Sequence, residues 1–205
     1  MPTSSIVLIG AGGHAKVVAD ALLKLGRQPS DIIVLDQDEM RIGTLILGIP
    51  VERYDPTRIA GRSFHVCIGD NATRKRFFNE LSAGPPLTII HPTASVSEQG
   101  YVGAGSFIAA QAVVGPDARI GRGCVVNHGA IVDHDADIDD FCHVAPGAAL
   151  GGAVRLGASV LVGAGANVLP GAMVGANTVI GAGSVVLNNL PADIVCAGVP
   201  ARRIR

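Results

Sequence analysis

Aliphatic residues recur at every sixth position in the second half of the chain, and most of the steps carry a small residue four places later. A fixed repeat of this kind is typical of a solenoid. The β-branched residues favour strands, and a period of six drifts against the 3.6-residue turn of a helix. We therefore predict a parallel β-helix. The positions that open the steps are Ile90, Val96, Val102, Ile108, Val114, Ile120, Val126, Val132, Ile138, Val144, Leu150, Leu156, Val162, Val168, Val174, Ile180 and Val186.

Three six-residue steps are expected to make one turn of a prism with three flat sheets, and the turns stack at the strand spacing of ~4.8 Å. The aliphatic residue of each step fills the axis, and the small residue fits inside a tight corner. Glycine is frequent at the second position of the step, as at Gly103 and Gly115. It suits a bend where a side chain would crowd its neighbours or where φ is unusual.

The first third of the chain follows a different pattern. Residues 6–9 form an apolar run that predicts a buried strand, a glycine-rich turn follows, and residues 16–25 have a helical pattern. A second apolar run at residues 32–35 ends at Asp36. This order of elements predicts a βαβ unit.

Residues 64–68 predict a further strand, and a helix is expected to follow it through Leu81. The region thus has the pattern of half of a doubly wound, Rossmann-like nucleotide fold. A helix cannot continue through the prolines of residues 84–86. We predict one domain over residues 1–86 and a second, the β-helix, over residues 87–205.

Charge and composition exclude several classes of function. A net charge of −1 and few aromatic residues argue against a nucleic-acid partner. The sequence contains no apolar stretch of about 18 residues, the length needed to cross a bilayer, and the first residues lack a signal-peptide pattern. We therefore expect a cytoplasmic protein without membrane insertion. The basic clusters at residues 74–76 and 202–205 are interpreted as solvated surface, with contact to a phosphate of a small ligand as the alternative. The four cysteines are widely spaced and are interpreted as core residues.

The turn at residues 10–16 joins a strand to a helix, where glycines allow close backbone approach and the helix N-terminus favours phosphate. It approximates the dinucleotide motif with Ala15 in the last place. Asp36 stands where such a fold holds a ribose. Because the domain has room for only one mononucleotide half, a nucleotide-linked substrate fits better than NAD. A purely structural tight turn is the alternative, and His14 is either a surface residue or part of the substrate site.

The repeats are most polar at residues 127–143, which contain three histidines and five aspartates. His128 and His134 occupy the third position of their steps and should point outward. His143 occupies a sixth position, on a different face from His134. If these two histidines share a site, a neighbouring subunit must supply one of them.

Three interpretations of this polar segment compete. A zinc site is one, because a carbonic anhydrase on the same kind of solenoid uses three histidines, but the spacings here do not resemble its ligand arrangement. Solvated histidines on an acidic edge are another. The third is a general base, since histidine titrates near neutral pH and the adjacent Asp135 could orient His134 or raise its basicity.

The whole chain resembles the bacterial nucleotide-sugar acetyltransferases of the PglD, NeuD and PerB type, which are left-handed β-helix proteins built from hexapeptide repeats. The matching motifs span nearly all of the sequence. They are Gly10-Ala-Gly-Gly-His14-Ala-Lys16, Ile68-Gly-Asp-Asn71, Ile90-His-Pro-Thr-Ala94, Val132-Asp-His134-Asp135, His143-Val-Ala-Pro-Gly147 and Gly198-Val-Pro-Ala201.

The resemblance implies a role for each of the candidate site residues. His134 is implied as the general base, Asp135 as its support where some relatives have Glu, and His143 as lying near the acetyl-CoA thioester, with a hydrogen bond to the developing oxyanion as a further hypothesis. The cosubstrate is acetyl-CoA, no metal is expected, and the active sites of a homotrimer lie between subunits. We assign His143 and Gly152 to acetyl-CoA, and the nucleotide sugar to Gly12, Gly13, His14, Asp36, Asp70, Asn71 and Asn127.

The expected activity is acetyl-CoA-dependent N-acetylation of a nucleotide-linked amino sugar, with a 4-amino-4,6-dideoxy sugar for a surface glycan as the first choice. UDP, GDP and dTDP are all open as carriers. An O-acetyltransferase for sialic acid shares the two-domain layout and is the alternative enzyme. A non-catalytic nucleotide-sugar-binding protein is the alternative from another class.

Overall fold

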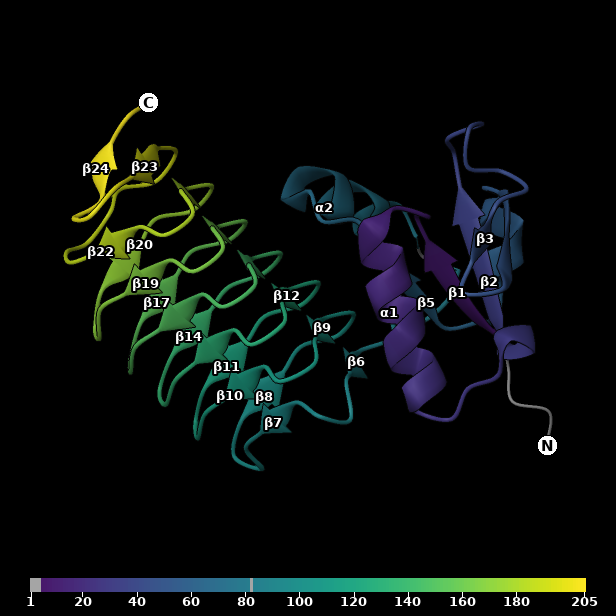
Figure 1. The fold of residues 1–205 in the computed structure, drawn as a ribbon, viewed down its shortest axis with the longest axis horizontal. Coiled ribbons are helices and arrows are strands. Elements are labelled where there is room, and N and C mark those ends of the chain that lie inside the picture. The colour runs from purple at the N-terminus through teal and green to yellow at the C-terminus, as the bar shows by residue number, and fades with distance from the viewer. Residues whose placement is uncertain (1–4, 82) are drawn as a thin grey trace.

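The computed structural model describes residues 5–81 and 83–205. An α/β unit at the N-terminal end stands beside a long β-helix, and the C-terminus lies at the far end of that β-helix (Figure 1). The turns of the β-helix run away from the α/β unit as coils of similar shape. The two architectures therefore follow one another along the chain, as the change in sequence pattern predicts.

The N-terminal sheet has five strands in the order β3-β4-β2-β1-β5. Strand β1 lies between β2 and β5 and is parallel to both, and β4 extends the parallel set. Only the short β3 is antiparallel to its neighbour. The strand bounds are β1 (Ile6–Ile9), β2 (Ile32–Asp36), β3 (Leu45–Ile46), β4 (Ile49–Arg53) and β5 (Phe64–Val66). The predicted βαβ unit is confirmed.

Two helices accompany this sheet. Helix α1 (Gly13–Lys24) begins three residues before the predicted helix, because Gly12 already serves as its N-cap, and it lies on the side of the sheet that faces the β-helix (Figure 1). Helix α2 (Asn71–Glu80) has the side chain of Asp70 as its N-cap. Two short 3-10 turns, Pro29–Asp31 and Pro56–Ile59, complete the unit.

The seventeen strands from β6 to β22 have two residues each, and every predicted opening position is the second residue of a strand. The expected six-residue register is therefore confirmed without a slip. The strands are β6 (Ile89–Ile90), β7 (Ser95–Val96), β8 (Tyr101–Val102), β9 (Phe107–Ile108), β10 (Val113–Val114), β11 (Arg119–Ile120), β12 (Val125–Val126), β13 (Ile131–Val132), β14 (Asp137–Ile138), β15 (His143–Val144), β16 (Ala149–Leu150), β17 (Arg155–Leu156), β18 (Leu161–Val162), β19 (Asn167–Val168), β20 (Met173–Val174), β21 (Val179–Ile180) and β22 (Val185–Val186).

Every third strand joins the same sheet, so the coils stack as three parallel sheets. The six-stranded sheet runs from β7 to β22, and the five-stranded sheet from β8 to β20. The eight-stranded sheet runs from β6 to β21 and continues into β23 (Val195–Ala197) and the antiparallel β24 (Arg202–Arg203). The aliphatic opening residues fill the axis of the prism, where most of them are fully buried.

The corners of the coils need a left-handed backbone at one position. From Gly105 to Gly183 the fourth residue of every step has a positive φ, including the non-glycine residues Asp135 (57°) and Phe141 (59°). The second-position glycines do not need positive φ. A Cβ on Gly103, for example, would lie 2.6 Å from the backbone of Gly121 in the next coil. Of the two reasons predicted for these glycines, crowding is therefore the one that applies.

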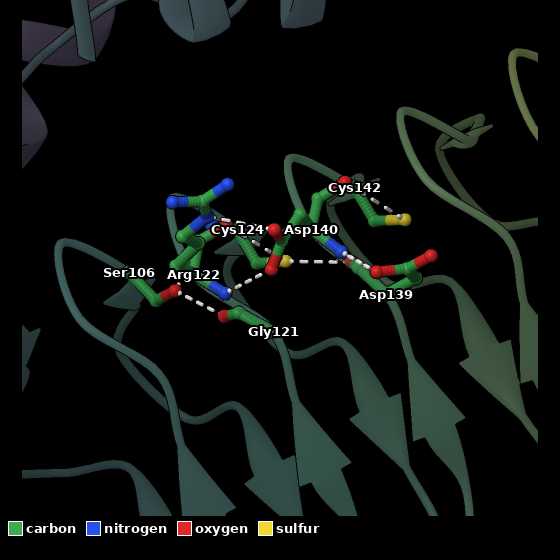
Figure 2. Close-up of polar contacts among 7 residues, drawn as sticks. All are labelled: Ser106, Gly121, Arg122, Cys124, Asp139, Asp140 and Cys142. Atoms are coloured by element: carbon green, nitrogen blue, oxygen red, sulfur yellow. Dashed lines mark hydrogen bonds and ion pairs between the residues drawn. The ribbon is translucent and has the colours of Figure 1, made fainter. Parts of the chain in front are cut away.

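Hydroxyl and thiol groups form a ladder at one corner of the prism (Figure 2). The Ser106 hydroxyl donates to the carbonyl of Gly121 (2.8 Å), and the Cys124 thiol donates to the carbonyl of Asp139 (3.2 Å) one coil further on. Cys142 repeats the contact in the following coil, with the Gly157 carbonyl (3.1 Å). All four cysteines are buried, as the sequence predicts. These three small polar residues satisfy corner carbonyls inside the coil stack.

The α/β unit packs against the eight-stranded sheet. The outward-facing residues of its first three strands, Ile89, Phe107 and Val125, are buried in the same cluster as residues of β1 and α1. Pro86 still bridges to Phe64 of the N-terminal sheet, whereas Ile89 already pairs with Phe107. The change of architecture therefore falls between Pro86 and Ile89; the division into domains at residues 86 and 87 stays a prediction.

Candidate functional site

A cavity of about 690 Å³ opens at the glycine turn between β1 and α1. Gly10 has a φ of 97°, and a Cβ there would lie 3.0 Å from Ile68, so the turn requires glycine at this position. Gly12 is the N-cap of α1 and offers no side-chain cap to the first turn. The uncapped N–H groups of this turn carry the positive end of the helix dipole, which favours an anion such as a phosphate.

Asp36 holds the glycine turn from the end of β2. Its Oδ2 atom accepts a hydrogen bond from the backbone N–H of Ala11 (2.5 Å), and its Oδ1 atom accepts one from Asp38 (2.8 Å). Gly12, Gly13, His14 and Asp36 all line the cavity. The structure thus brings together four of the residues that were assigned to the nucleotide sugar, at the carboxyl ends of β1 and β2.

His14 reaches from this cavity toward the β-helix. Its ring meets Phe107 edge-on, with the centroids 5.5 Å apart, and its Nε2 atom is buried without a hydrogen-bond partner. Burial, followed by the charges of His65, His143 and Arg74, lowers the pKa of His14 to about 3. His14 is therefore neutral at physiological pH, and it is not a free surface residue.

His143 lies on β15, facing the α/β unit, and both of its ring nitrogens have partners. Nδ1 contacts the carbonyl oxygen of Gly69 (3.2 Å), and Nε2 contacts Nδ2 of Asn127 (3.2 Å). The Asn127 amide is oriented by its Oδ1 atom, which accepts from the backbone N–H of His128 (2.9 Å). A carbonyl only accepts and an amide nitrogen only donates, so both contacts require the neutral tautomer with its proton on Nδ1.

Burial is the main cause of the low pKa of His143, about 4, and the charge of Arg74 lowers it further. The ring is therefore neutral near pH 7. In the Nδ1–H tautomer its only N–H group is directed to Gly69, so this arrangement leaves no donor for an oxyanion. The free donor of the group is the second N–H of the Asn127 amide, because the first is used by His143.

His134 lies at the corner between β13 and β14, and its side chain points outward, as predicted. Its Nδ1 atom is 2.7 Å from Oδ2 of Asp135, and both side chains are more than half exposed. The hydrogen bond that His134 donates to Asp135, and then the charge of Asp133, raise the pKa of His134. The neutral ring donates from Nδ1 to the carboxylate, which leaves Nε2 as a free acceptor for a proton.

Two glycines bracket His134. A Cβ on Gly115, in the preceding coil, would lie 2.7 Å from the backbone nitrogen of His134. A Cβ on Gly152, in the following coil, would lie 2.5 Å from Cε1 of the imidazole. The backbone of His134 therefore stacks on one glycine and its ring rests on the other. Gly152, which we assigned to acetyl-CoA, is directly adjacent to the His134 ring.

The two remaining predicted residues lie where the α/β unit meets the β-helix. Asp70 is the N-cap of α2 and accepts from the backbone N–H of Thr73 (2.8 Å). Hydrogen bonding with the side chain and then the backbone of Thr73 lowers the pKa of Asp70. Asn71 donates from Nδ2 to the carbonyls of Ser159 (3.0 Å) and Val160 (3.2 Å). Both residues line a second cavity, of about 680 Å³, that also contains His143. The Asn71 amide is thus used for packing as well as lying at a cavity.

The predicted residues fall into two groups on different parts of the prism. His143 faces the α/β unit from the eight-stranded sheet, where it contacts the Gly69 carbonyl, and Asn127 contacts its ring. His134, Asp135 and Gly152 are at the corner between the six-stranded and the five-stranded sheets. The described residues contain no cluster of three His, Cys, Asp or Glu side chains that could hold a metal ion. No helix of the described ranges is long and apolar enough to cross a membrane.

Comparison with known proteins agrees with both parts of this architecture. Residues 5–81 match the family described as PglD N-terminal domain, and residues 153–188 match the bacterial transferase hexapeptide family. PerB from Caulobacter crescentus, solved in complex with CoA and GDP-perosamine, is 35% identical with a TM-score of 0.91, and 98% of each chain is covered. The chain belongs to the PglD-type sugar N-acetyltransferases.

Another solved member of this family is the acetyltransferase domain of PglB from Neisseria gonorrhoeae in complex with acetyl coenzyme A. It is 33% identical, with a TM-score of 0.90 and coverage of 98% of this chain and 100% of that domain. A histidine mutant of perosamine N-acetyltransferase from Caulobacter crescentus is 36% identical, with a TM-score of 0.92 and coverage of 98% and 97%. No curated protein gave a significant match. The predicted fold class, with its left-handed parallel β-helix, is confirmed.

Sequence reasoning missed one buried residue beside the candidate site. Arg74 was interpreted as part of a solvated basic cluster, and that interpretation is wrong, because only 1% of the residue is exposed. Its spacing from Asn71 and Phe78, three and four residues along one face of α2, was the available signal. This spacing alone does not predict burial, because a charged residue is almost never fully buried unless it is paired.

Proposed function

We propose that this protein transfers the acetyl group of acetyl-CoA to the amino group of a nucleotide-linked amino sugar. The observation that carries the proposal is the exposed His134–Asp135 pair, whose 2.7 Å hydrogen bond leaves the Nε2 atom of His134 as a proton acceptor. The glycine-turn cavity supports a nucleotide diphosphate, because it opens onto the uncapped N-terminus of α1. A 4-amino-4,6-dideoxy sugar for a surface glycan is the acceptor we propose.

The reaction proceeds by direct transfer. The neutral sugar amine attacks the carbonyl carbon of the thioester and forms the C–N bond, while His134 accepts the proton of the amine. Collapse of the tetrahedral intermediate breaks the C–S bond, and the proton is returned to the leaving sulfur, so that CoA leaves as the thiol. General-base catalysis of this kind contributes roughly 10²–10⁴ in rate.

We propose a homotrimer in which neighbouring protomers complete each site. His134 and His143 are on different faces of one prism, so a second copy must bring one of them to the other. The six-stranded sheet supports such packing, since Val113 and Ile131 expose 37% and 42% of their surface on its outer face. The thioester would lie where Gly152 and His134 of one protomer meet Asn127 and His143 of the next. We place the protein in the cytoplasm, where acetyl-CoA is available.

The test is CoA release by the purified protein with acetyl-CoA and a panel of GDP-, UDP- and dTDP-linked 4-amino sugars, with free sialic acid alongside. The GDP-linked sugars come first, because a GDP-perosamine complex is among the related structures. Turnover with an amino sugar and a base-stable amide product supports the proposal and names the carrier. Turnover with sialic acid alone and a base-labile ester would replace it with O-acetylation, and binding without CoA release would replace it with a non-catalytic role.

His134→Ala is the matched control for this panel. It should lower turnover by roughly 10²–10⁴ while the oligomer stays folded, because the side chain is more than half exposed and lies outside the aliphatic core. Gel filtration and thermal unfolding check the fold. Near-wild-type turnover of a folded His134→Ala protein would contradict the assignment of the base.

A further inference from the structure

Arg74 is a buried cation in the middle of the molecule. Its guanidinium comes from the first turn of α2 and is enclosed between the α/β unit and the β-helix, with 1% of the residue exposed. The oxygens that accept its hydrogen bonds belong to carbonyl and amide groups and not to carboxylates. A buried charge is costly unless its donors are all satisfied, so the hydrogen bonds of this side chain define what it does.

The donors of Arg74 reach both parts of the chain. Nε donates to the carbonyl of Gly123 (2.7 Å), and Nη2 donates to those of Phe141 (2.9 Å) and Cys142 (3.3 Å), all on the β-helix. Nη1 donates to the carbonyls of Ile68 and Gly69 (both 3.0 Å), on the loop between β5 and α2. Nη2 also donates to Oδ1 of Asn71 (2.7 Å). The planar fork therefore fixes the Gly69 loop to two coils of the β-helix at once.

The Gly69 carbonyl connects Arg74 to the candidate site. It accepts from Nη1 of Arg74 and from Nδ1 of His143 through its two lone pairs. Because the proton of His143 is held on Nδ1, its Nε2 atom must accept from the Asn127 amide. The amide then has one N–H group left over. A chain of four groups thus leads from Arg74 to the second N–H group of the Asn127 amide.

We propose that Arg74 is a positioning residue for the transfer step, which acts through Gly69 and His143 to aim the free N–H group of Asn127. The proposal rests on the function proposed above, since it assigns that N–H to the carbonyl oxygen of the acetyl group in the transition state. Arg74 itself touches neither substrate. Its part is to hold the acceptor that selects the tautomer of His143.

A lysine at position 74 keeps the positive charge but loses the planar arrangement of guanidinium N–H donors. In Arg74→Lys the single ammonium group cannot reach Gly123, Gly69 and Cys142 together, so the Gly69 carbonyl is released and His143 is free to exchange tautomers. We expect kcat to fall on the order of 100-fold, the cost of a misplaced group in the transition state. The KM for the nucleotide sugar should change less than kcat, because Arg74 bonds only Ile68 and Gly69 among the residues of the glycine-turn cavity, and neither the glycine turn nor Asp36. Arg74→Gln is the second variant.

The second readout is the tautomer itself. Ring-nitrogen NMR of 15N-histidine-labelled protein, with His143 assigned by its loss in His143→Gln, distinguishes Nδ1–H from Nε2–H. We expect the Nδ1–H form in the wild type and a mixture in Arg74→Lys. Arg122→Gln is the matched control: this arginine lies at the same corner but pairs with Asp140 in solvent (Figure 2). It should leave kcat and tautomer unchanged.

The outcomes separate the two proposals. An Nε2–H or a charged His143 in the wild type overturns the positioning role whether or not the variants fold. Unchanged tautomer or unchanged kcat in a folded Arg74→Lys protein overturns it as well. If the wild type acetylates no sugar, the proposed function fails, but the tautomer comparison still reports on the link between Arg74 and His143.

Discussion

The imidazole ring of His134 rests on Gly152: a Cβ atom at Gly152 would lie 2.5 Å from Cε1 and 2.6 Å from Nε2 of the ring. No real Cβ atom approaches another atom so closely. Because the ring is exposed, it can swing outward to make room. The relationship therefore concerns the direction of Nε2 and not the stability of the fold.

Gly152→Ala should give a folded but slow enzyme. The added methyl group displaces the His134 ring, and a displacement of about 1 Å at the base costs on the order of 100-fold in turnover. The melting temperature should change little. In a His134→Ala background the same substitution should have no further effect on turnover, since the ring it displaces is gone. Equal losses in the two backgrounds would contradict this account.

Asp135→Asn should move the acid limb of the kcat profile to lower pH. The hydrogen bond of Asp135 raises the pKa of His134, so its loss lets the pKa fall and keeps the base unprotonated to lower pH. The plateau rate should also fall, because an amide orients the ring less well. Asp133→Asn is the comparison variant, since Asp133 accepts from the backbone N–H of His134 and raises the pKa of the ring through its charge alone. It should shift the limb less and keep the plateau; a shift toward higher pH in either variant would be the wrong sign.

The free energy of unfolding should fall as pH drops from about 6.5 toward 4. His65, His143 and His14 have folded-state pKa values of about 4, 4 and 3, lowered mainly by burial. Between those values and the ordinary pKa near 6.5 the unfolded chain binds more protons, so stability is lost as pH falls. Each fully neutral histidine contributes a slope of up to about 1.4 kcal/mol per pH unit.

Urea unfolding at pH 7.5, 6.5 and 5.5 measures this slope. His65→Gln is the informative variant, because its amide can still donate to the Leu87 carbonyl that His65 contacts at 2.9 Å. The variant should make the pH dependence of the free energy of unfolding shallower, because it removes one of the three buried histidines. This holds whatever the variant does to the free energy of unfolding at pH 7.5. A free energy of unfolding that stays constant from pH 7.5 to 5.5 would rule out the burial of neutral histidines.

Cys124→Ser should be nearly neutral, and Cys124→Ala should destabilise the β-helix. Serine can repeat the contact that Ser106 makes with the Gly121 carbonyl one coil earlier. Alanine leaves the Asp139 carbonyl without its donor, which costs about 1–3 kcal/mol. Urea unfolding of the two variants side by side makes the comparison. An alanine variant as stable as the serine variant would show that the thiol serves only to fill space.

The β-helix could be predicted position by position because one rule repeats in every coil. An aliphatic residue must point to the axis at each sixth position, and the strand ends at Val132 or Val144 follow from that requirement alone. Helix α1 was predicted three residues short. Glycine and histidine have lower helix propensity than the alanine and lysine that follow, but the N-cap at Gly12 made them the first turn.

The candidate site was less predictable, since its contacts join segments far apart in the sequence. His134 and Asp135 are adjacent, so their pairing could be inferred. The contact between Gly69 and His143 depends on how α2 docks, and the one between Gly152 and His134 depends on the stacking of coils eighteen residues apart. Local pattern does not carry such information. Arg74 shows the limit most clearly, because a charged residue flanked by Lys75 and Arg76 has the pattern of a surface.

The docking of α2 also fixes the position of the α/β unit along the axis of the β-helix. Arg74 and Asn71 attach the α/β unit to the coils that contain Gly123, Phe141 and Ser159, and the later coils extend past this level toward the C-terminus (Figure 1). Adding or deleting a whole coil after Asn177 leaves that level unchanged. An extra coil between Gly123 and Phe141 would separate acceptors that a single guanidinium must reach, by one strand spacing of ~4.8 Å. Coils added at the far end therefore leave the docking of α2 in place, while the number of coils between Gly123 and Phe141 is fixed.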